Sequence, residues 1–411
     1  MNAEIILMQA KELQPTLTKY RRHLHANPEL GFDLVSTKEY VKNELLSMGY
    51  APVECGRCGL VALTGGKNQG KTFLIRADMD ALPIQEQTNV EFASKNAGKM
   101  HACGHDLHTA MLLGAAKLLK EHEDEIQGTV KLMFQPSEET FEGSKDMIEH
   151  GLLENPKIEA ALMIHVSMGM PLPTGTAIVC DGGVSAPAAD YFRIEIQGKG
   201  CHGAMPQLGV DPITIAAHIV IALQELQARE LAMAEEAALT IGTIQAGVAG
   251  NVIPDTATLN GTIRTYDENV RTRLKNRLQE ICKGMADLYR GKADVTFTSG
   301  CPTLLNSSEL SDSVTGYCKE LLGSSAFSVS DFARMSGADG KAAKATGSED
   351  FAYVSHEVPS IMIALSAGNV KDGFTYPLHH PKVNFDENAL AYGSAVYTYS
   401  AMRWLEKHNQ V

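Results

Sequence analysis

The stretch TFLIRADMD, residues 72–80, decides how this chain folds. Its first six residues form a short, mainly apolar run of the length of a buried strand, and Asp78 and Asp80 stand at its end. A second run of the same kind, TVKLMF at 129–134, leads into the acidic sequence QPSEE at 135–139. Ligands of open α/β sheets bind outside the carboxyl ends of the strands, so these two strand ends indicate a functional edge.

Helical patterns alternate with such strands along the chain. The segment AMLLGAAKLLKEH at 110–122 has apolar residues at helical spacing, and Thr109 is expected to be its N-cap. The chain before Met48 also has a helical pattern, which Asn27-Pro28 interrupts. This alternation predicts an α/β fold with a mostly parallel sheet flanked by helices.

A second pattern begins near residue 184. Strand, helix, strand, strand, helix and strand follow one another in the order β-α-β-β-α-β, which is typical of a ferredoxin-like α+β domain. We therefore expect a discontinuous α/β domain at 1–183 and 297–411, interrupted by an inserted domain at 184–296.

Composition excludes several classes of protein. The 411 residues carry 36 Lys and Arg against 49 Asp and Glu, a net charge of −13, which argues against a nucleic-acid partner. No apolar stretch approaches the roughly 18 residues of a membrane helix, and the first residues lack a basic export signal. The eight cysteines are scattered, so free thiols and a cytoplasmic location are expected, and the CxxC at Cys55 and Cys58 is interpreted as two incidental thiols.

Metal-ligand residue types gather at the predicted functional edge. Residues 101–108, HACGHDLH, combine imidazole, thiolate and carboxylate donors, and His165 ends a further apolar run. Such a mixture suits Zn²⁺, Mn²⁺ or Co²⁺. The adjacent Glu138 and Glu139 would be costly to bury without a cation, because like charges at close range oppose ionisation. One carboxylate that binds a metal and one that accepts a proton from water is the arrangement that metal-assisted hydrolysis needs.

Motifs along nearly the whole chain resemble those of the M20 metallopeptidases, in particular the branch of hippurate hydrolases, N-acyl amino acid amidohydrolases and plant auxin-conjugate hydrolases. These motifs are RRHLHANPELGF (21–32), RADMDALPI (76–84), MHACGHDLHTAMLLGAA (100–116), FQPSEE (134–139), IHV (164–166), CHGAMPQLGVDPI (201–213), NVIPDTATLNGTIRT (251–265), GSEDFAY (347–353) and LHHP (378–381). The resemblance specifies a family more closely than it specifies a substrate.

The resemblance implies a dinuclear site for two divalent metal ions and a role for each matching residue. Its metal ligands would be Cys103, His105, Glu139, His165 and His379. Glu138 would be the general base, and Asp80 would orient a ligand. Many M20 peptidases have a histidine where this chain has Asp78, a departure that marks the branch with the cysteine ligand.

The same resemblance implies that 1–183 and 297–411 form the catalytic metal-binding domain and that 184–296 is a dimerisation and lid domain. It also assigns substrate groups to the inserted domain and its surroundings. His202 would polarise the scissile carbonyl across a homodimer interface, and Asn251, Arg264 and Gly347 would contact the substrate. An arginine can hold a free carboxylate through two hydrogen bonds, although a strand-end salt bridge is the other interpretation of Arg264.

The expected activity is hydrolysis of the amide bond of a small N-acyl amino acid or dipeptide. A metallo-dipeptidase and an N-acetyl-diaminopimelate deacetylase are the alternatives among enzymes. A non-catalytic metal-dependent binding protein is the alternative outside them, and the presence of Glu138 argues against it.

Overall fold

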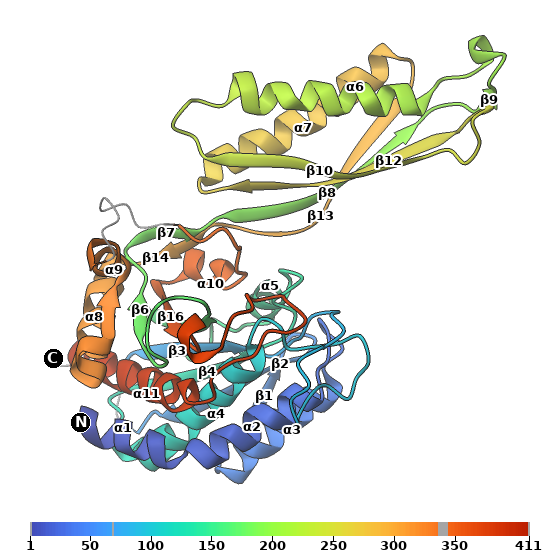
Figure 1. Ribbon diagram of the computed structural model, residues 1–411. Coiled ribbons are helices and arrows are strands. Elements are labelled where there is room, and N and C mark those ends of the chain that lie inside the picture. The colour runs from blue at the N-terminus through green and yellow to red at the C-terminus, as the bar shows by residue number, and fades with distance from the viewer. Residues whose placement is uncertain (1, 68–69, 336–343, 410–411) are drawn as a thin grey trace. The chain divides into compact units, whose positions relative to one another are not determined.

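The computed structural model describes residues 2–67, 70–335 and 344–409. Contacts divide the chain into two compact units, which are described separately (Figure 1). Unit 1 comprises Met1–Ser185, Leu305–Lys344 and Asp350–Val411, and unit 2 comprises Ala186–Leu304 and Ala345–Glu349. None of the helices within the described ranges is both long and apolar enough to cross a bilayer.

Unit 1 contains an eight-stranded sheet in the order β1-β2-β4-β3-β5-β16-β6-β15. Its strands are β1 (Val53–Cys55), β2 (Gly59–Gly65), β3 (Thr72–Asp78), β4 (Thr129–Gln135), β5 (Ala160–Ser167), β6 (Ala177–Val179), β15 (Ala326–Ser328) and β16 (Ser360–Ser366). The four central strands β4, β3, β5 and β16 run parallel to one another. Every residue of β3 is buried, as expected for a parallel strand covered on both faces.

Helices flank this sheet and complete unit 1 (Figure 1). They are α1 (Ala3–Glu12), α2 (Gln14–Ala26), α3 (Val35–Ser47), α4 (His105–Glu121), α5 (Gly143–Glu149), α8 (Ser308–Leu322), α9 (Val329–Met335), α10 (Ala352–Glu357) and α11 (Ala389–His408), with short 3₁₀ turns at Glu123–Glu125, Gly323–Ser325 and Val370–Asp372. The predicted α/β class with a mostly parallel, helix-flanked sheet is thus confirmed.

The start of α4 differs from the expectation. The helix begins at His105, four residues before its predicted first turn, because Gly104 at φ 93° supplies the left-handed residue that starts it. Thr109 is therefore inside the helix, where its hydroxyl donates to the carbonyl of Asp78 at 2.7 Å and does not cap the helix. The prediction of Thr109 as N-cap was wrong. Because α4 begins at His105, His105 and His108 lie on one helical turn.

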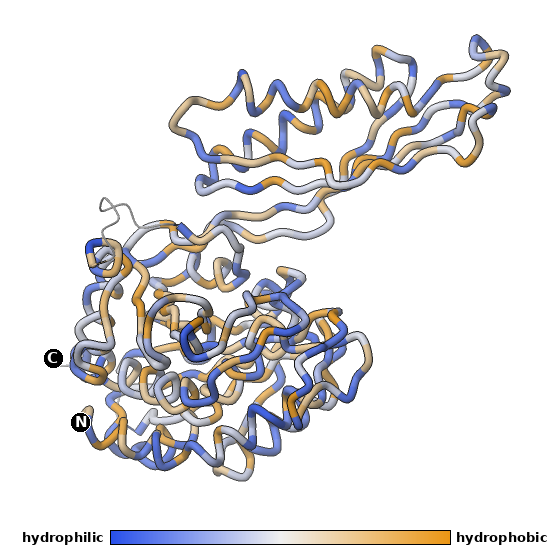
Figure 2. Tube along the Cα trace, viewed as in Figure 1, coloured by the Kyte–Doolittle hydropathy of each residue, from blue (hydrophilic) through white to orange (hydrophobic). Residues whose placement is uncertain are grey.

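Unit 2 is a four-stranded antiparallel sheet in the order β10-β12-β8-β13, with two helices. Its main elements are β8 (Ala188–Gln197), α6 (Pro212–Glu225), β10 (Ala237–Ala246), β12 (Thr256–Thr265), α7 (Glu268–Leu288) and β13 (Lys292–Cys301). Shorter elements are β9 (Cys201–His202), β11 (Val252–Ile253), a 3₁₀ turn at Pro206–Leu208 and a π turn at Leu226–Glu230. Buried and exposed residues alternate along β8 from Asp190 onward, and Figure 2 shows hydrophobic and hydrophilic residues interspersed through unit 2. One face of the sheet therefore packs against the helices.

The limits of unit 2 differ from the predicted 184–296. Strand β13 runs past residue 296 to Cys301, because a bulge between Phe297 and Ser299 lets its pairing with β8 continue. Unit 2 consequently extends to Leu304 and also takes in Ala345–Glu349. The chain passes between the units through β7 (Gly183–Ala186) and β14 (Leu304–Asn306), which pair with each other.

Candidate metal centre

The candidate metal centre lies at the carboxyl ends of the central strands of unit 1. Asp78 ends β3, the two glutamates follow β4, and His165 lies near the end of β5. The loop before α4 supplies Cys103, and the loop after β16 supplies His379. Five segments that are distant in sequence thus bring their donors to one edge, as parallel strands require.

The first group of donors surrounds the thiol of Cys103. Its Sγ lies 3.5 Å from Nε2 of His165 and 3.2 Å from Nε2 of His379. Nε2 of His379 also lies 3.6 Å from Oε1 of Glu139. A metal ion among these atoms would have sulfur, nitrogen and oxygen ligands, a combination that zinc and its neighbours accept.

The second group surrounds His105, whose side chain is 1 % exposed. Its Nε2 lies 3.9 Å from Oε2 of Glu138 and 3.8 Å from Oε1 of Glu139. Potential ligand atoms of Cys103, His105 and His165 also lie within 4.8 Å of one another, so the two groups share members. Shared donors of this kind suit two neighbouring ions.

Buried polar atoms without a hydrogen-bond partner indicate whether these residues fit a metal ion. Nε2 of His105 and Oε1 of Glu139 are buried and have no hydrogen-bond partner among the described residues. Nδ1 of His105 lies 2.9 Å from the carbonyl oxygen of Asp80, and Nδ1 of His165 lies 2.7 Å from that of Val166. Since a carbonyl can only accept, both Nδ1 atoms carry hydrogen, so Nε2 is the nitrogen of each ring that can bind a metal. The residues present therefore fit a metal ion.

The pKa shifts of Glu139 and Cys103 also favour a bound metal ion. Burial, followed by the charges of Asp80 and Asp78, raises the pKa of Glu139 to about 7, against the opposing effect of His105. Burial also raises the pKa of the Cys103 thiol well above its usual value. Both groups bind metals in their deprotonated forms, so a cation here would supply the charge that the protein alone lacks.

Asp80 lies where the sequence predicted an orienting carboxylate. Its Oδ1 accepts the backbone N–H of Glu138 at 3.0 Å, and its Oδ2 accepts that of Glu139 at 3.2 Å. Oδ1 is also 3.5 Å from Nδ1 of His105. Asp80 thus contacts three residues of the candidate site without offering its own oxygens to an ion.

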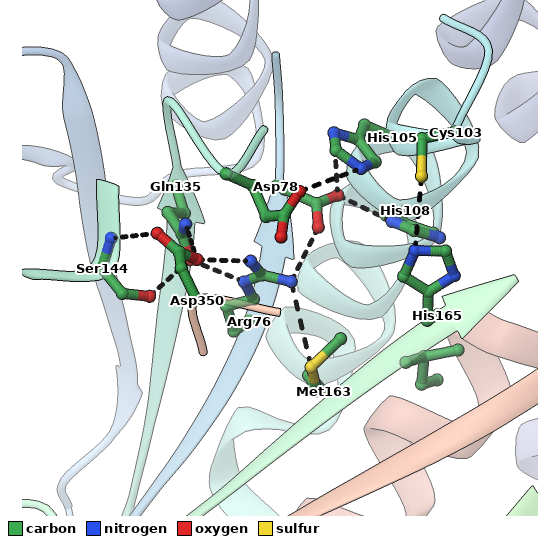
Figure 3. A network of polar contacts seen from close by, with 12 residues as sticks. Arg76, Asp78, Cys103, His105, His108, Gln135, Ser144, Met163, His165 and Asp350 are labelled. Carbon is green, nitrogen blue, oxygen red and sulfur yellow. Dashed lines mark hydrogen bonds and ion pairs between the residues drawn. The ribbon is translucent and has the colours of Figure 1, made fainter. Parts of the chain in front are cut away.

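Sequence reasoning missed a buried network beside the ligands (Figure 3). Nη1 of Arg76 donates to Asp78 at 2.7 Å, Nε donates to Gln135 at 2.7 Å, and Nη2 lies 3.3 Å from Asp350. Asp78 also lies 2.6 Å from Nδ1 of His108. Two signals were present in the sequence: Arg76 and Asp78 share one face of β3, and His108 lies one helical turn after His105.

The remaining predicted site residues belong to unit 2. His202 on β9 is exposed, and β9 pairs with β11 beside Asn251, whose carbonyl accepts the N–H of Gly203 at 2.8 Å. A side chain at Gly203 would come within 2.9 Å of that carbonyl oxygen, so the close approach explains the glycine.

Arg264 on β12 lies at a second place in unit 2. It donates to the hydroxyl of Ser348 at 2.6 Å and to that of Tyr191 at 3.2 Å, and Ser348 directly follows Gly347. Among the described residues, no carboxylate forms an ion pair with Arg264. The strand-end salt bridge considered for Arg264 is absent from that part of the chain.

Comparisons with known proteins agree with this architecture. The model of peptidase family M20/M25/M40 matches residues 74–403. The chain is 36% identical over 400 residues to N-acetyl-L-cysteine deacetylase of Bacillus subtilis, covering 97% of this chain and 90% of that protein. It is 37% identical over 407 residues to IAA-amino acid hydrolase ILR1-like 2 of Arabidopsis thaliana, covering 97% and 87%.

A solved structure shows the same fold. The Bacillus subtilis YXEP protein, described as a dinuclear metal binding peptidase of the M20 family, superposes with a TM-score of 0.76 at 32% identity, covering 96% of this chain and 99% of that one. This chain is a hydrolase that belongs to the M20/M25/M40 peptidase family.

Proposed function

We propose that this protein hydrolyses the amide bond of small N-acyl amino acids at a centre of two divalent metal ions. The observation that carries the proposal is the convergence of one thiol, three imidazoles and two carboxylates at one sheet edge. Among the described residues, the buried Nε2 of His105 and Oε1 of Glu139 have no hydrogen-bond partner. Relatives named as an N-acetyl-L-cysteine deacetylase and an IAA-amino acid hydrolase support this substrate class.

The ions would be held by the residues that the sequence analysis named. These are Cys103, His105, Glu139, His165 and His379. Bound divalent cations lower the pKa of water towards neutrality and polarise a carbonyl oxygen. Zn²⁺, Mn²⁺ and Co²⁺ all accept this donor set, and the thiolate favours the softer of them.

Glu138 would move the proton. Its side chain is buried, 6 % exposed, and its backbone is fixed by Asp80. One of its oxygens lies 3.9 Å from His105, so its carboxylate borders the ligands. Glu138 would take a proton from the attacking water and deliver it to the nitrogen of the leaving amino acid.

Unit 2 would bind the rest of the substrate. Arg264 has hydroxyl partners and no carboxylate partner among the described residues, so its charge is available for the carboxylate of an amino acid. Gly347 would leave space for substrate beside Ser348. Asn251 and the exposed His202 would contact the scissile carbonyl, His202 as an oxyanion donor.

A homodimer through unit 2 is part of the proposal. Strand β10 is an edge strand of its sheet, and Ile213 and Ile221, 45 % and 66 % exposed, lie on α6. An edge strand and an exposed apolar helix face are surfaces that a second copy can cover. The cytoplasmic location expected from the sequence stays a prediction.

The test is a substrate panel with the unsubstituted protein and Glu138→Gln. We expect hydrolysis of acetyl-amino acids or hippurate, loss of that activity with a chelator, and a loss of about 10²- to 10⁴-fold in kcat in Glu138→Gln with metal still bound. Preference for dipeptides or for N-acetyl-diaminopimelate would identify a different member of the same class. Tight binding without turnover by the unsubstituted chain would contradict the enzyme.

A further inference from the structure

Strand β5 continues beyond the end of its pairing with β3, although its pairing with β16 on the other side extends to Ser167. Its pairing with β3 ends where Arg76 faces Met163, whereas β5 itself runs on to Ser167. Backbone N–H groups in a buried position need acceptors, so the partners of this extension must come from elsewhere.

Two side chains accept those N–H groups. The hydroxyl of Tyr397 accepts from Ile164 at 3.0 Å and donates to the carbonyl of Arg76 at 2.6 Å. Nε2 of His108 accepts from the N–H of Val166 at 2.9 Å. The sheet can therefore open at its carboxyl edge, where the metal centre lies, without leaving these backbone groups unpaired.

This contact fixes the state of His108. Because Nε2 accepts a hydrogen bond, the hydrogen of a neutral ring is on Nδ1, which donates to Asp78 at 2.6 Å. The other oxygen of Asp78 accepts from Arg76. Asp78, His105 and His108 lie close enough to hold an ion, yet Asp78 and His108 already use their donor atoms on each other, Arg76 and Val166.

The backbone of Val166 links His108 to the metal centre. The N–H of Val166 donates to His108, and the carbonyl of Val166 accepts from Nδ1 of His165. The opposite nitrogen of His165, Nε2, faces Sγ of Cys103 at 3.5 Å, as Figure 3 shows.

We propose that His108 is a positioning residue for His165. By holding the N–H of Val166, it fixes the backbone of that residue, whose carbonyl accepts from Nδ1 of His165. It thereby keeps Nε2 of His165 directed towards Cys103, with which it would hold an ion. The inference rests on the proposed metal centre and assigns a role to a residue that is itself no ligand. Outer partners of this kind typically contribute about 10- to 100-fold in metal affinity.

Two conservative variants separate the two hydrogen bonds of His108. In His108→Gln the amide oxygen reaches the position of Nε2 and can accept from Val166. In His108→Asn the shorter amide reaches only Asp78. The control is Tyr50→Phe, which removes another buried hydrogen bond of unit 1, from Tyr50 to the carbonyl of Ala116 at 2.7 Å.

The readouts are Zn²⁺ affinity by chelator competition and the visible absorption of the Co²⁺-loaded protein. We expect His108→Asn to lower Zn²⁺ affinity by about 10- to 100-fold and to change the thiolate-to-Co²⁺ band. His108→Gln should stay close to the unsubstituted protein, and Tyr50→Phe should lower the melting temperature alone. Circular dichroism checks folding, and His108→Ala, with the same expected loss, replaces any His108→Asn protein that does not fold.

The possible outcomes separate the role of His108 from the metal centre and from the proposed activity. Unchanged affinity in His108→Asn, or equal losses in the Asn and Gln variants, would overturn the role of His108. An unsubstituted chain that binds neither Zn²⁺ nor Co²⁺ would overturn the metal centre and this inference together. The expected affinity pattern without hydrolysis of any N-acyl amino acid would support His108 and overturn only the proposed activity.

Discussion

The carboxylate of Asp80 accepts a hydrogen bond from the backbone N–H of Glu138 at 3.0 Å, so the end of β3 holds the start of the loop that follows β4. The other oxygen of Asp80 holds the N–H of Glu139 in the same way, at 3.2 Å. One aspartate therefore fixes both the proposed base and a proposed ligand through their backbones. Its side chain positions other residues of the site, and the metal ions would be bound by other donors.

Asp80→Asn should weaken metal binding. An amide can accept from only one of the two N–H groups, so the other loses its partner and faces an NH₂ group. We expect metal affinity to fall by about 10- to 100-fold and the free energy of unfolding to fall by about 1–3 kcal/mol. Chelator competition and urea unfolding measure the two effects.

A matched control is Asp146→Asn, because Asp146 also accepts a backbone N–H, that of Arg57 at 2.7 Å, away from the ligands. This variant should lose stability and keep its metal affinity. Equal metal affinities in Asp80→Asn and the unsubstituted protein would show that Asp80 does not support the ligands.

Metal removal should destabilise unit 1 in a pH-dependent way. In the metal-free protein the pKa of Glu139 is raised to about 7, so below that pH the carboxyl group is protonated and must release its proton when it binds an ion. Metal affinity should consequently fall as the pH drops below about 7. Proton release during metal uptake, measured in weakly buffered solution, should be larger at pH 6 than at pH 8.

Thermal unfolding measures how much metal removal lowers the stability of the folded chain. Free metal at 100 times its dissociation constant should stabilise the folded chain by about 2.7 kcal/mol relative to the chelated protein. Mg²⁺, which prefers oxygen ligands, is the control ion and should not restore the melting temperature. An identical melting curve with and without chelator would contradict a metal centre in this part of the molecule.

Much of the fold could be predicted because its signals are local. The buried runs of β3 and β4 and the helical patterns around them identify an α/β layer, and the β-α-β-β-α-β order identifies unit 2. The start of α4 could not be predicted in this way, since it depends on the left-handed conformation of Gly104 and on a contact of Thr109 with β3. The end of β13 depends on a bulge that only its partner strand reveals.

The candidate site also has parts that could be predicted from the sequence and parts that could not. Its donor residues are visible in the sequence because their types and spacing suit a metal. The contact between Arg76 and Asp78 had a signal in the sequence, the spacing of two residues on one strand, which was missed. The contact of His108 with Val166 depends on which N–H groups remain where the pairing of β3 with β5 ends, and this tertiary geometry leaves no pattern in a single sequence.

Arg264 should discriminate between substrates by their carboxylate. Its guanidinium donates to the hydroxyls of Ser348 and Tyr191 and lies 5.6 Å from the ring centroid of Tyr191, so Arg264→Met removes a positive charge without breaking an ion pair among the described residues. We expect the preference for an N-acyl amino acid over its α-amide to fall by at least about tenfold in kcat/KM, because a hydrogen bond to a charged group contributes about 1.5–3 kcal/mol.

Arg193→Met in the same sheet is the control, since Arg193 pairs with Glu195 on an exposed face. That variant should keep the substrate preference. A preference that is unchanged in Arg264→Met would remove Arg264 from the proposed binding site.

Cys282 makes the stability of unit 2 sensitive to alkaline pH. Its side chain is 0 % exposed in the core of unit 2, and burial alone raises the pKa of its thiol to about 12. An unfolded thiol ionises near pH 8.5, so between these values the unfolded state loses a proton that the folded state keeps. The stability conferred by the neutral thiol is complete below about pH 8.5 and falls by about 1.4 kcal/mol for each further pH unit until the folded thiol also ionises.

Cys282→Val, which nearly conserves the volume, removes this titration. Its free energy of unfolding should change less steeply than that of the unsubstituted protein between about pH 9 and pH 11, measured by urea unfolding. Cys201→Val, at a half-buried position of the same unit, is the control for the substitution itself. Parallel curves for Cys282→Val and the unsubstituted protein would mean that the Cys282 thiol reaches water before the unit unfolds.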